Sequence, residues 1–388
     1  MHLTHLSLAN FRNYAKQELD LAPGTILLLG ENAQGKTNLL EAVALLATGR
    51  SERADSDADF IAWDAREETQ PVARIVAHAL RASGEVSVEL TVAGKTGVRG
   101  NLLGAKRFKL NGVARRAADV TGAILAVLFT TDDMDLVKGG PAGRRRYLDV
   151  MLAQVDRPYA RALQQYTKLV TQRNALLKRI QERSARPSEL SYWDTELSTH
   201  GGTLLLLRAQ AVGALSAHAA AAHARLSGDR EVFALAYAPR FVAEWPPERI
   251  AAGPEQDVAA ALLARFEETH DRDIGAGVTL AGPHRDDLEM TIGGEPASSF
   301  ASRGQQRTAA LALRLAEARY ITERSGEQPV LLLDDVLSEL DESRRASVLG
   351  AIEADQVWIT SADADRFSKK FTAAAQCWRV EDGAATPV

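Results

Sequence analysis

A glycine-rich loop stands between an expected strand and an expected helix near the start of this 388-residue chain. Residues 26–29 are all apolar and follow the turn-forming pair Pro23 and Gly24, which is typical of a buried strand. Residues 38–46 carry apolar side chains at helical spacing. The loop between them consists of Gly30, Glu31, Asn32, Ala33, Gln34, Gly35, Lys36 and Thr37. A strand, such a loop and a helix in this order predict a phosphate-binding site in an α/β fold.

The residue types of this phosphate loop (residues 30–37) suit a nucleoside triphosphate with a metal ion. Gly30 and Gly35 let the backbone curl so that its N–H groups point at phosphate oxygens. Lys36 places a positive charge near the β- and γ-phosphates, and the hydroxyl of Thr37 is suited to Mg²⁺. The N-terminus of the following helix adds partial positive charge. We therefore predict ATP and Mg²⁺ as ligands.

A second apolar run, at residues 330–333, ends in two carboxylates, Asp334 and Asp335. Four apolar residues after a polar turn fit a strand that is buried on both faces. Two adjacent carboxylates at its end are costly unless they hold a cation. We expect Asp334 to bind Mg²⁺ and Asp335 to position or deprotonate the attacking water. The alternative is a solvated pair of aspartates, which would give the phosphate loop no metal-binding carboxylate as a partner.

A third segment, residues 302–307, opens a predicted helix over residues 305–324 and is called the signature segment below. Alanine and leucine dominate this helix and give it high propensity and a broad apolar face. Ser302 stands where a helix N-cap belongs, and Gly304 permits close backbone approach. The free N–H groups would form a second anion site. An ordinary serine-capped surface helix is the alternative if the segment is considered alone.

The three segments, followed by residues 338–341, resemble in their order the ABC-type ATPase heads of the SMC and recombination-repair families. Within that class the chain resembles the RecF family of bacterial recombination mediators. The similarity includes residues 6–14, 129–134, 143–149 and 282–288, and it runs from near residue 1 to about residue 370. The resemblance implies a nucleotide shared between two copies of the chain. Ser302, Gly304 and Gln305 of one protomer would contact the γ-phosphate held by Lys36 of the other.

Further roles follow from the same resemblance. Asp341 would lie along the dimer interface, and Arg12 would reach the nucleotide phosphates. Thr360 or Ser361 would stand where transporter relatives carry a histidine. The resemblance also implies ATP-driven dimerisation on duplex or gapped DNA in recombinational repair and replication restart. RecR and RecO would be partners that help to load the recombinase RecA.

The expected enzyme activity is a weak, DNA-linked ATPase. Asp335 replaces the glutamate that is usual in the wider ABC class, and its side chain is one methylene shorter. A well-positioned general base contributes roughly 10²–10⁴-fold to a rate. A carboxylate that holds the water less well therefore predicts slow hydrolysis.

Composition favours a globular protein of the cytoplasm. Hydrophobic residues make up 46% and charged residues 25% of the chain, as in ordinary globular proteins. The single Cys377 cannot form an intramolecular disulfide and fits a reducing compartment. No secretory signal is recognisable, and no histidine pattern predicts a zinc site. Residues 203–223 are apolar, but Arg208 and three other polar residues interrupt them, which favours a buried helix over a membrane span.

Three basic clusters are candidates for DNA contact although the net charge is −5. Such clusters are commonly just solvated surface, and the resemblance to a DNA-repair family favours phosphate contacts without sequence specificity. We predict that Lys106, Arg107, Lys109, Arg115, Arg116, Arg144 and Arg145 contact DNA. The first cluster also includes Lys95 and Arg99, and the second also includes Arg146. The third cluster comprises Arg173, Lys178, Arg179, Arg183 and Arg186.

The predicted fold is α/β: an ABC-type P-loop ATPase head with a mixed sheet and a small antiparallel β-lobe, plus an inserted α-helical arm domain. Residues 1–140 would form the first half of the head, with the β-lobe at about 70–120. Residues 141–275 would form the arm, and residues 276–388 the second half of the head. Strands are expected at residues 3–8, 27–29, 74–80 and 86–92, a hairpin at 109–113, and long helices at 157–183 and 188–226. Residues 238–257 would be an irregular connection, and 381–388 a frayed end.

Other functions are considered on the same residues. An ATP-binding transporter subunit is the main alternative, and the long helical insertion and the lack of a clear glutamine loop argue against it. A chromosome-structural SMC protein needs hundreds of coiled-coil residues. A P-loop kinase or GTPase would leave the signature segment without a role. The segment Gly282-Pro283-His284-Arg285-Asp286-Asp287 is either a loop near the nucleotide or DNA, or a charged turn.

Overall fold

The computed structural model describes residues 1–388 apart from 52, 97–101, 242–244, 341 and 364–365. The chain divides into two compact units. The first comprises Met1–Asp133 and Glu317–Val388, and the second is Met134–Ala316. The predicted boundary near residue 140 lies close to the observed one. The predicted boundary near 275 differs, because residues 276–316 pack with the helical unit.

The first unit contains a six-stranded sheet in the order β15-β14-β3-β13-β12-β8. All neighbours except β14 and β15 are parallel, so the carboxyl ends of five strands lie at one edge. Strands β12 and β13 are buried at every position, as expected of parallel strands covered on both faces. The strands are β3 (Gly24–Leu29), β8 (Ala126–Phe129), β12 (Val330–Leu333), β13 (Gln356–Ser361), β14 (Gln376–Glu381) and β15 (Ala384–Pro387).

A second, antiparallel sheet in the first unit has the order β2-β1-β4-β5-β6-β7. It is larger than the predicted β-lobe, because the first two strands pair with β4. The predicted strands near residues 74–80 and 86–92 and the hairpin at Asn111 and Gly112 are confirmed. Its strands are β1 (His2–Phe11), β2 (Tyr14–Asp20), β4 (Val72–Arg81), β5 (Gly84–Thr96), β6 (Leu102–Leu110) and β7 (Val113–Arg115).

Helix α1 (Lys36–Thr48) contacts strands of both sheets and is buried along most of its length. It follows the phosphate loop directly, so packing of the helix fixes the position of the loop. The other helical elements of the first unit are short: η1 (Asp57–Phe60), η2 (Asp64–Glu67), α2 (Ala117–Val120), η3 (Thr131–Asp133), η6 (Val336–Glu339), α12 (Glu342–Ala351) and α13 (Lys369–Ala374).

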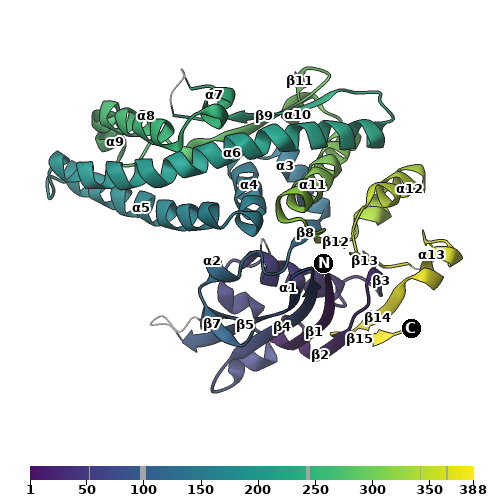
Figure 1. The fold of residues 1–388 in the computed structure, drawn as a ribbon. Coiled ribbons are helices and arrows are strands. Elements are labelled where there is room, and N and C mark those ends of the chain that lie inside the picture. The colour runs from purple at the N-terminus through teal and green to yellow at the C-terminus, as the bar shows by residue number, and fades with distance from the viewer. Residues whose placement is uncertain (52, 97–101, 242–244, 341, 364–365) are drawn as a thin grey trace. The chain divides into compact units, whose positions relative to one another are not determined.

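The second unit is built around two long helices, α5 (Arg157–Gln181) and α6 (Leu190–Ser227), which run beside each other (Figure 1). Both helices were predicted, with the break at Pro187 where η4 (Pro187–Glu189) lies. A small antiparallel sheet in the order β11-β10-β9 packs against α6 and α4. The remaining elements are α3 (Met134–Lys138), α4 (Pro141–Val155), β9 (Phe233–Ala238), α7 (Pro247–Ala252), α8 (Glu255–Glu268), α9 (His270–Ala276), η5 (Pro283–Arg285), β10 (Asp287–Ile292), β11 (Glu295–Pro296) and α10 (Ala297–Phe300). Helix α11 (Arg303–Ser325) belongs to the second unit up to Ala316 and to the first from Glu317.

Helix α6 is a core helix of this unit. The stretch Pro187–Ser227 is long and apolar enough to cross a membrane by length and composition alone. However, α6 packs against α5, α8 and β9, and its Asp194 and Arg208 are buried in ion pairs. The predicted irregular connection at residues 238–257 is partly wrong, since it includes α7 and the start of α8.

Two buried arginines hold the second unit together. Arg173 is fully buried and pairs with Asp194 at 2.8 Å and Asp273 at 2.7 Å. Arg208 is 2% exposed and pairs with Asp149 at 2.7 Å and Asp286 at 3.2 Å. Breaking such a buried pair is strongly destabilising because it leaves an uncompensated charge in the interior.

The segment 282–287 supplies part of this buried network, as expected of a charged turn, and its predicted proximity to nucleotide or DNA stays a prediction. Asp286 accepts hydrogen bonds from Arg208, from the Tyr237 hydroxyl and from the Arg240 backbone N–H. His284 bonds to Tyr166 and to the Thr279 carbonyl. Burial lowers the pKa of His284 to about 4, which keeps the ring neutral. Within the second unit the segment is a buried structural turn.

Candidate nucleotide-binding site

The phosphate loop connects β3 to α1 at the carboxyl edge of the parallel sheet, where ligands bind in open α/β sheets. Lys36 is 7% exposed as a residue, and its ammonium donates hydrogen bonds to the carbonyls of Gly30, at 2.6 Å, and Glu31, at 2.7 Å. Burial lowers the pKa of Lys36, while the charges of Asp335 and Asp334 oppose this shift. A charged donor is therefore held inside the loop, at the place where a phosphate chain needs one.

Asp334 lies at the end of β12 and joins the loop to the neighbouring strand. Its Oδ1 accepts hydrogen bonds from the hydroxyls of Thr37, at 2.9 Å, and Thr360, at 3.0 Å. Burial raises the pKa of Asp334, while these hydrogen bonds oppose the shift. The structure thus brings together the hydroxyl and the carboxylate that were predicted from segments 297 residues apart.

Asp335 follows in a backbone conformation that is uncommon for a residue with a side chain. Its φ is 54°, in the left-handed region, and its backbone N–H donates to Thr360 Oγ1 at 2.8 Å. Its Oδ1 is buried and has no hydrogen-bond partner among the described residues. Strained backbone and unsatisfied buried oxygens are costly and concentrate at functional sites. This oxygen is free to accept a bond from a ligand or water.

Sequence reasoning left open whether Thr360 or Ser361 stands at the nucleotide. Thr360, at the end of β13, contacts both carboxylate residues, whereas the Ser361 hydroxyl donates to the Asp363 carbonyl. The Thr360 side chain therefore joins the two carboxylate residues, while the Ser361 carbonyl accepts from the Gly30 N–H at 3.3 Å, and which of the two matches the transporter histidine stays open.

Arg12 has a partner within its own unit. Its guanidinium donates to both carboxylate oxygens of Glu41, at 2.9 and 2.6 Å, and to the Asp59 carbonyl at 3.1 Å. Glu41 lies in α1, the helix that follows the phosphate loop. Arg12 thus anchors this helix, and its predicted contact with phosphates stays a prediction.

The signature segment lies in the second unit and has the predicted cap. The backbone N–H of Gln305 donates to Ser302 Oγ at 3.3 Å, and the Gln305 side chain accepts from the Ser302 N–H at 2.7 Å. This reciprocal pair is a capping box. The helix begins two residues earlier than predicted, at Arg303. Asp341, predicted at the same interface, lies outside the described residues.

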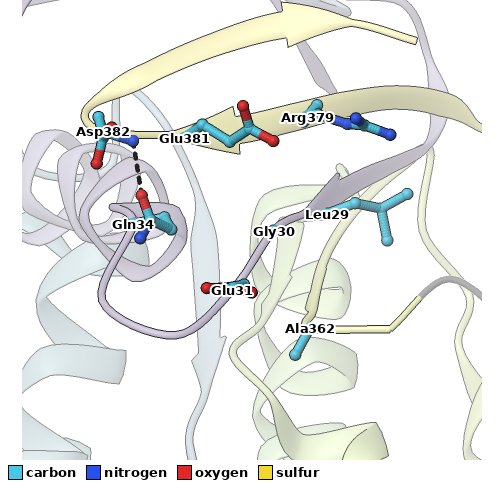
Figure 2. A pocket seen from close by; sticks show the side chains of 8 residues that line it. All are labelled: Leu29, Gly30, Glu31, Gln34, Ala362, Arg379, Glu381 and Asp382. Carbon is cyan, nitrogen blue, oxygen red and sulfur yellow. Dashed lines mark hydrogen bonds between the residues drawn. The ribbon is translucent and has the colours of Figure 1, made fainter.

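Sequence reasoning missed the hairpin formed by β14 and β15 and treated part of it as a frayed end. Strand β14 pairs with β3, and the two-residue turn at Asp382 and Gly383 reaches the phosphate loop. Backbone N–H groups of Asp382 and Gly383 donate to the Gln34 side chain, at 2.7 Å, and carbonyl, at 3.2 Å. Figure 2 shows this contact at the rim of an open pocket of about 440 Å³. The Asp-Gly pair was a hairpin signal in the sequence.

Replacing Gly383 with alanine should weaken ATP binding by up to about 30-fold, since two hydrogen bonds of roughly 1 kcal/mol each hold Gln34. Gly383 has φ +73°, and an added Cβ would lie 2.1 Å from the Asn13 carbonyl oxygen. The measurement is the Kd for ATP by calorimetry. Gly112→Ala is the matched control, because Gly112 has φ +78° in a similar turn with open space around it. Equal Kd values for the two variants would contradict a role for the hairpin.

The predicted DNA-contacting residues have different surroundings. Arg107, Arg115 and Arg116 are exposed on or beside β6 and β7. Lys106 pairs with Asp57 at 2.8 Å, and Lys109 pairs with Glu89 at 3.0 Å. Arg107, Arg115 and Arg116 therefore remain the best candidates for DNA contact in this cluster. Arg99 lies outside the described residues.

Two arginines of the other clusters are not surface residues, which corrects their assignment. Arg144 is 8% exposed and forms a two-point ion pair with Asp287, at 2.7 and 2.9 Å. Arg173 is fully buried, as described above. Arg145 is half-buried and donates to the Asp286 carbonyl at 2.7 Å. Basic clusters in sequence were misleading here because their acidic partners are distant in the chain.

Comparison with known proteins agrees with this fold. The family model described as the RecF/RecN/SMC N terminal domain matches residues 2–384. An SMC head bound to the C-winged helix domain of ScpA has a similar fold, with a TM-score of 0.53 at 16% identity, covering 100% of this chain and 97% of that one. These similarities place the chain in the class of SMC-type ATPase heads.

More specific similarity is found with one branch of that class. The DNA replication and repair protein RecF of Roseiflexus castenholzii is 43% identical over 405 residues and covers 100% of both chains. RecF of Chloroflexus aurantiacus is 44% identical, over 99% of each chain. A solved structure of the recombination mediator protein RecF with ATP, in the RecFOR pathway, has a TM-score of 0.86 and 31% identity, covering 100% of this chain and 97% of that one. The chain belongs to the RecF family of DNA replication and repair proteins.

Proposed function

We propose that this protein is an ATP-dependent DNA-binding protein of recombinational repair and replication restart. The observation that carries the proposal is the meeting of Lys36, Thr37, Asp334 and Asp335 at one edge of the parallel sheet. Membership of the RecF family supports ATP as the nucleotide, because a RecF structure with ATP is among its close structural relatives. It also favours DNA repair over the transporter and chromosome-structural alternatives.

Thr37 and Asp334 are the residues that would hold Mg²⁺. Hydroxyl and carboxylate oxygens are the hard ligands that this ion prefers, usually together with phosphate oxygens and water. In the structure these two side chains already touch, and the neighbouring Asp335 has an unsatisfied oxygen. The residues present therefore fit the ion. When bound, Mg²⁺ would neutralise charge on the β- and γ-phosphates.

The roles of the protein groups follow from their surroundings. Lys36 would exchange its two carbonyl partners for phosphate oxygens and so bind the β- and γ-phosphates. Asp335 would accept a hydrogen bond from the attacking water through its free Oδ1. Because its side chain is short, we expect the water to be held loosely and hydrolysis to be slow.

A second copy of the chain would complete the site. Ser302, Gly304 and Gln305 present a capped helix N-terminus, which is suited to an anion. In this proposal they bind the γ-phosphate held by Lys36 of the other protomer. ATP then assembles the dimer and hydrolysis releases it.

The dimer would act on duplex or gapped DNA in the cytoplasm. Arg107, Arg115 and Arg116 are the exposed candidates for phosphate contacts, which predict binding that weakens with salt and has little sequence preference. RecR and RecO are proposed as partners in loading RecA, since two RecF structures similar to this chain are described as part of the RecFOR pathway.

The test is the mass of the protein in light scattering with ATP, ADP or no nucleotide, with and without gapped duplex DNA. Wild type should dimerise with ATP alone, and DNA should favour the dimer. Ser302→Arg should remain monomeric with ATP, because the long side chain blocks close approach to the helix N-terminus. Its Kd for ATP in the monomer should stay within about 2-fold of wild type, a change of only about 0.4 kcal/mol.

Ser191→Arg is the matched control, because Ser191 is exposed near the opposite end of α6 from the signature segment. At 1.5 Å per residue, the two ends of this 38-residue helix lie about 57 Å apart. A wild type that is monomeric under all conditions, or a Ser302→Arg variant that dimerises normally, would remove the shared-site mechanism.

A further inference from the structure

A carboxylate from another element holds the signature segment in the second unit. Glu231 lies just before β9, and its Oε1 accepts a hydrogen bond from Gln305 Nε2 at 2.8 Å. The other end of the Gln305 amide accepts from the Ser302 N–H. Since a carboxylate can only accept, it fixes which end of the amide faces Ser302. Glu231 therefore sets the orientation of Gln305.

The second oxygen of Glu231 faces a buried residue that has no hydrogen bond. His223, near the end of α6, is fully buried and stacks on Phe233 at 5.2 Å between ring centroids. Neither ring nitrogen has a hydrogen-bond partner within 3.5 Å among the described residues. Burial lowers the pKa of His223, while the charge and the backbone of Glu231 oppose this shift. Nε2 is 3.9 Å from Glu231 Oε2, beyond hydrogen-bond distance. A buried, unsatisfied imidazole so close to a carboxylate is costly.

Glu231 also conflicts with the ligand proposed for this segment. A γ-phosphate bound at the N-terminus of α11 would carry negative charge close to the Glu231 carboxylate, and like charges repel strongly where water is excluded. The phosphate would also compete for the amide of Gln305. The carboxylate then gains from moving away, and His223 Nε2 is an available donor.

We propose that Glu231 is a positioning residue with two alternative partners. Without nucleotide it holds Gln305 in the capped conformation seen here. When the triphosphate of a second copy docks, the carboxylate leaves Gln305 and bonds to His223. This inference rests on the proposed shared site and adds the device that keeps the signature segment ordered until the nucleotide arrives.

Two substitutions test separately the charge of Glu231 and the hydrogen-bond donor of His223. Glu231→Gln keeps an oxygen that can accept from Gln305 but removes the charge, so ATP-dependent dimerisation should become about 10-fold tighter, within the usual range for residues in contact. His223→Phe keeps the ring stacked on Phe233 but removes the donor, so dimerisation should become about 10-fold weaker. Dimer dissociation constants would be measured with ATP by analytical ultracentrifugation.

The double variant provides the decisive comparison. With no charge to relocate, His223→Phe should have little effect in the Glu231→Gln background. A purely structural role would instead weaken dimerisation in both single variants and add in the double. That result, or unchanged dimerisation of both single variants while wild type dimerises, would overturn the role of Glu231 and leave the shared site standing. A wild type that stays monomeric with ATP would overturn the shared site and this role with it.

Discussion

Lys36→Met should reduce the affinity for ATP by roughly 10²–10⁴-fold, since it removes two hydrogen bonds to charged groups worth about 1.5–3 kcal/mol each. The ammonium is buried in the phosphate loop and near two carboxylates. Methionine has a similar length and keeps the packing of the stem. Calorimetry with ATP and Mg²⁺ would measure the change, and ATP-driven dimerisation should disappear with it.

The control for this variant is Lys16→Met, at an exposed position on β2. It removes the same charge from the same unit and should leave the Kd for ATP unchanged. Circular dichroism of both variants would establish that the fold is retained. A Lys36→Met protein that binds ATP as tightly as wild type would exclude the phosphate loop as the nucleotide site.

Arg173→Ala should lower the free energy of unfolding by about 3–5 kcal/mol, the usual cost of removing one partner of a buried ion pair. The substitution removes the cation from Asp273 and leaves His270, at 2.6 Å, as the remaining partner of Asp194, and both carboxylates are almost fully buried. Chemical denaturation with urea, followed by helix signal, would measure the loss. Because 3–5 kcal/mol is a large fraction of the stability of most domains, we expect poor expression at 37 °C.

Arg179→Ala on the same helix is the comparison, because Arg179 is exposed. It should change the free energy of unfolding by less than about 0.5 kcal/mol, as most surface substitutions do. If Arg173→Ala also lowered the free energy of unfolding by less than about 0.5 kcal/mol, its ion pairs would contribute little to stability. The helical unit would then depend on its apolar packing.

The parts of the site that depend on local sequence could be predicted. The loop around Lys36, the carboxylates after β12 and the Ser302 cap each follow from the residues immediately around them. The two long helices were also predictable, since their apolar spacing and the break at Pro187 are local patterns.

The parts of the fold and the site that depend on partners distant in the chain could not be predicted from the sequence. Arg144 and Arg173 belong to basic clusters in sequence, and the acidic residues that neutralise them are 21 to 143 residues away. Gln305 was assigned to a phosphate contact without any sign of its partner Glu231, 74 residues away. Pairing at such separations is set by the fold and leaves no local pattern.

The pairing of β14 with β3 has a consequence for how the protein is made. Gln34 and Asp382 are separated by 348 residues, and β3 has strands from the far end of the sequence on both sides. During synthesis on the ribosome, β3 emerges long before its two neighbours in the sheet, β13 and β14, have been made. Until then its edges are open to wrong pairing, and folds dominated by such distant contacts form slowly. The phosphate loop thus gains its contact with Asp382 only after that residue has been translated, and protection of the nascent chain by chaperones should raise the yield of folded protein.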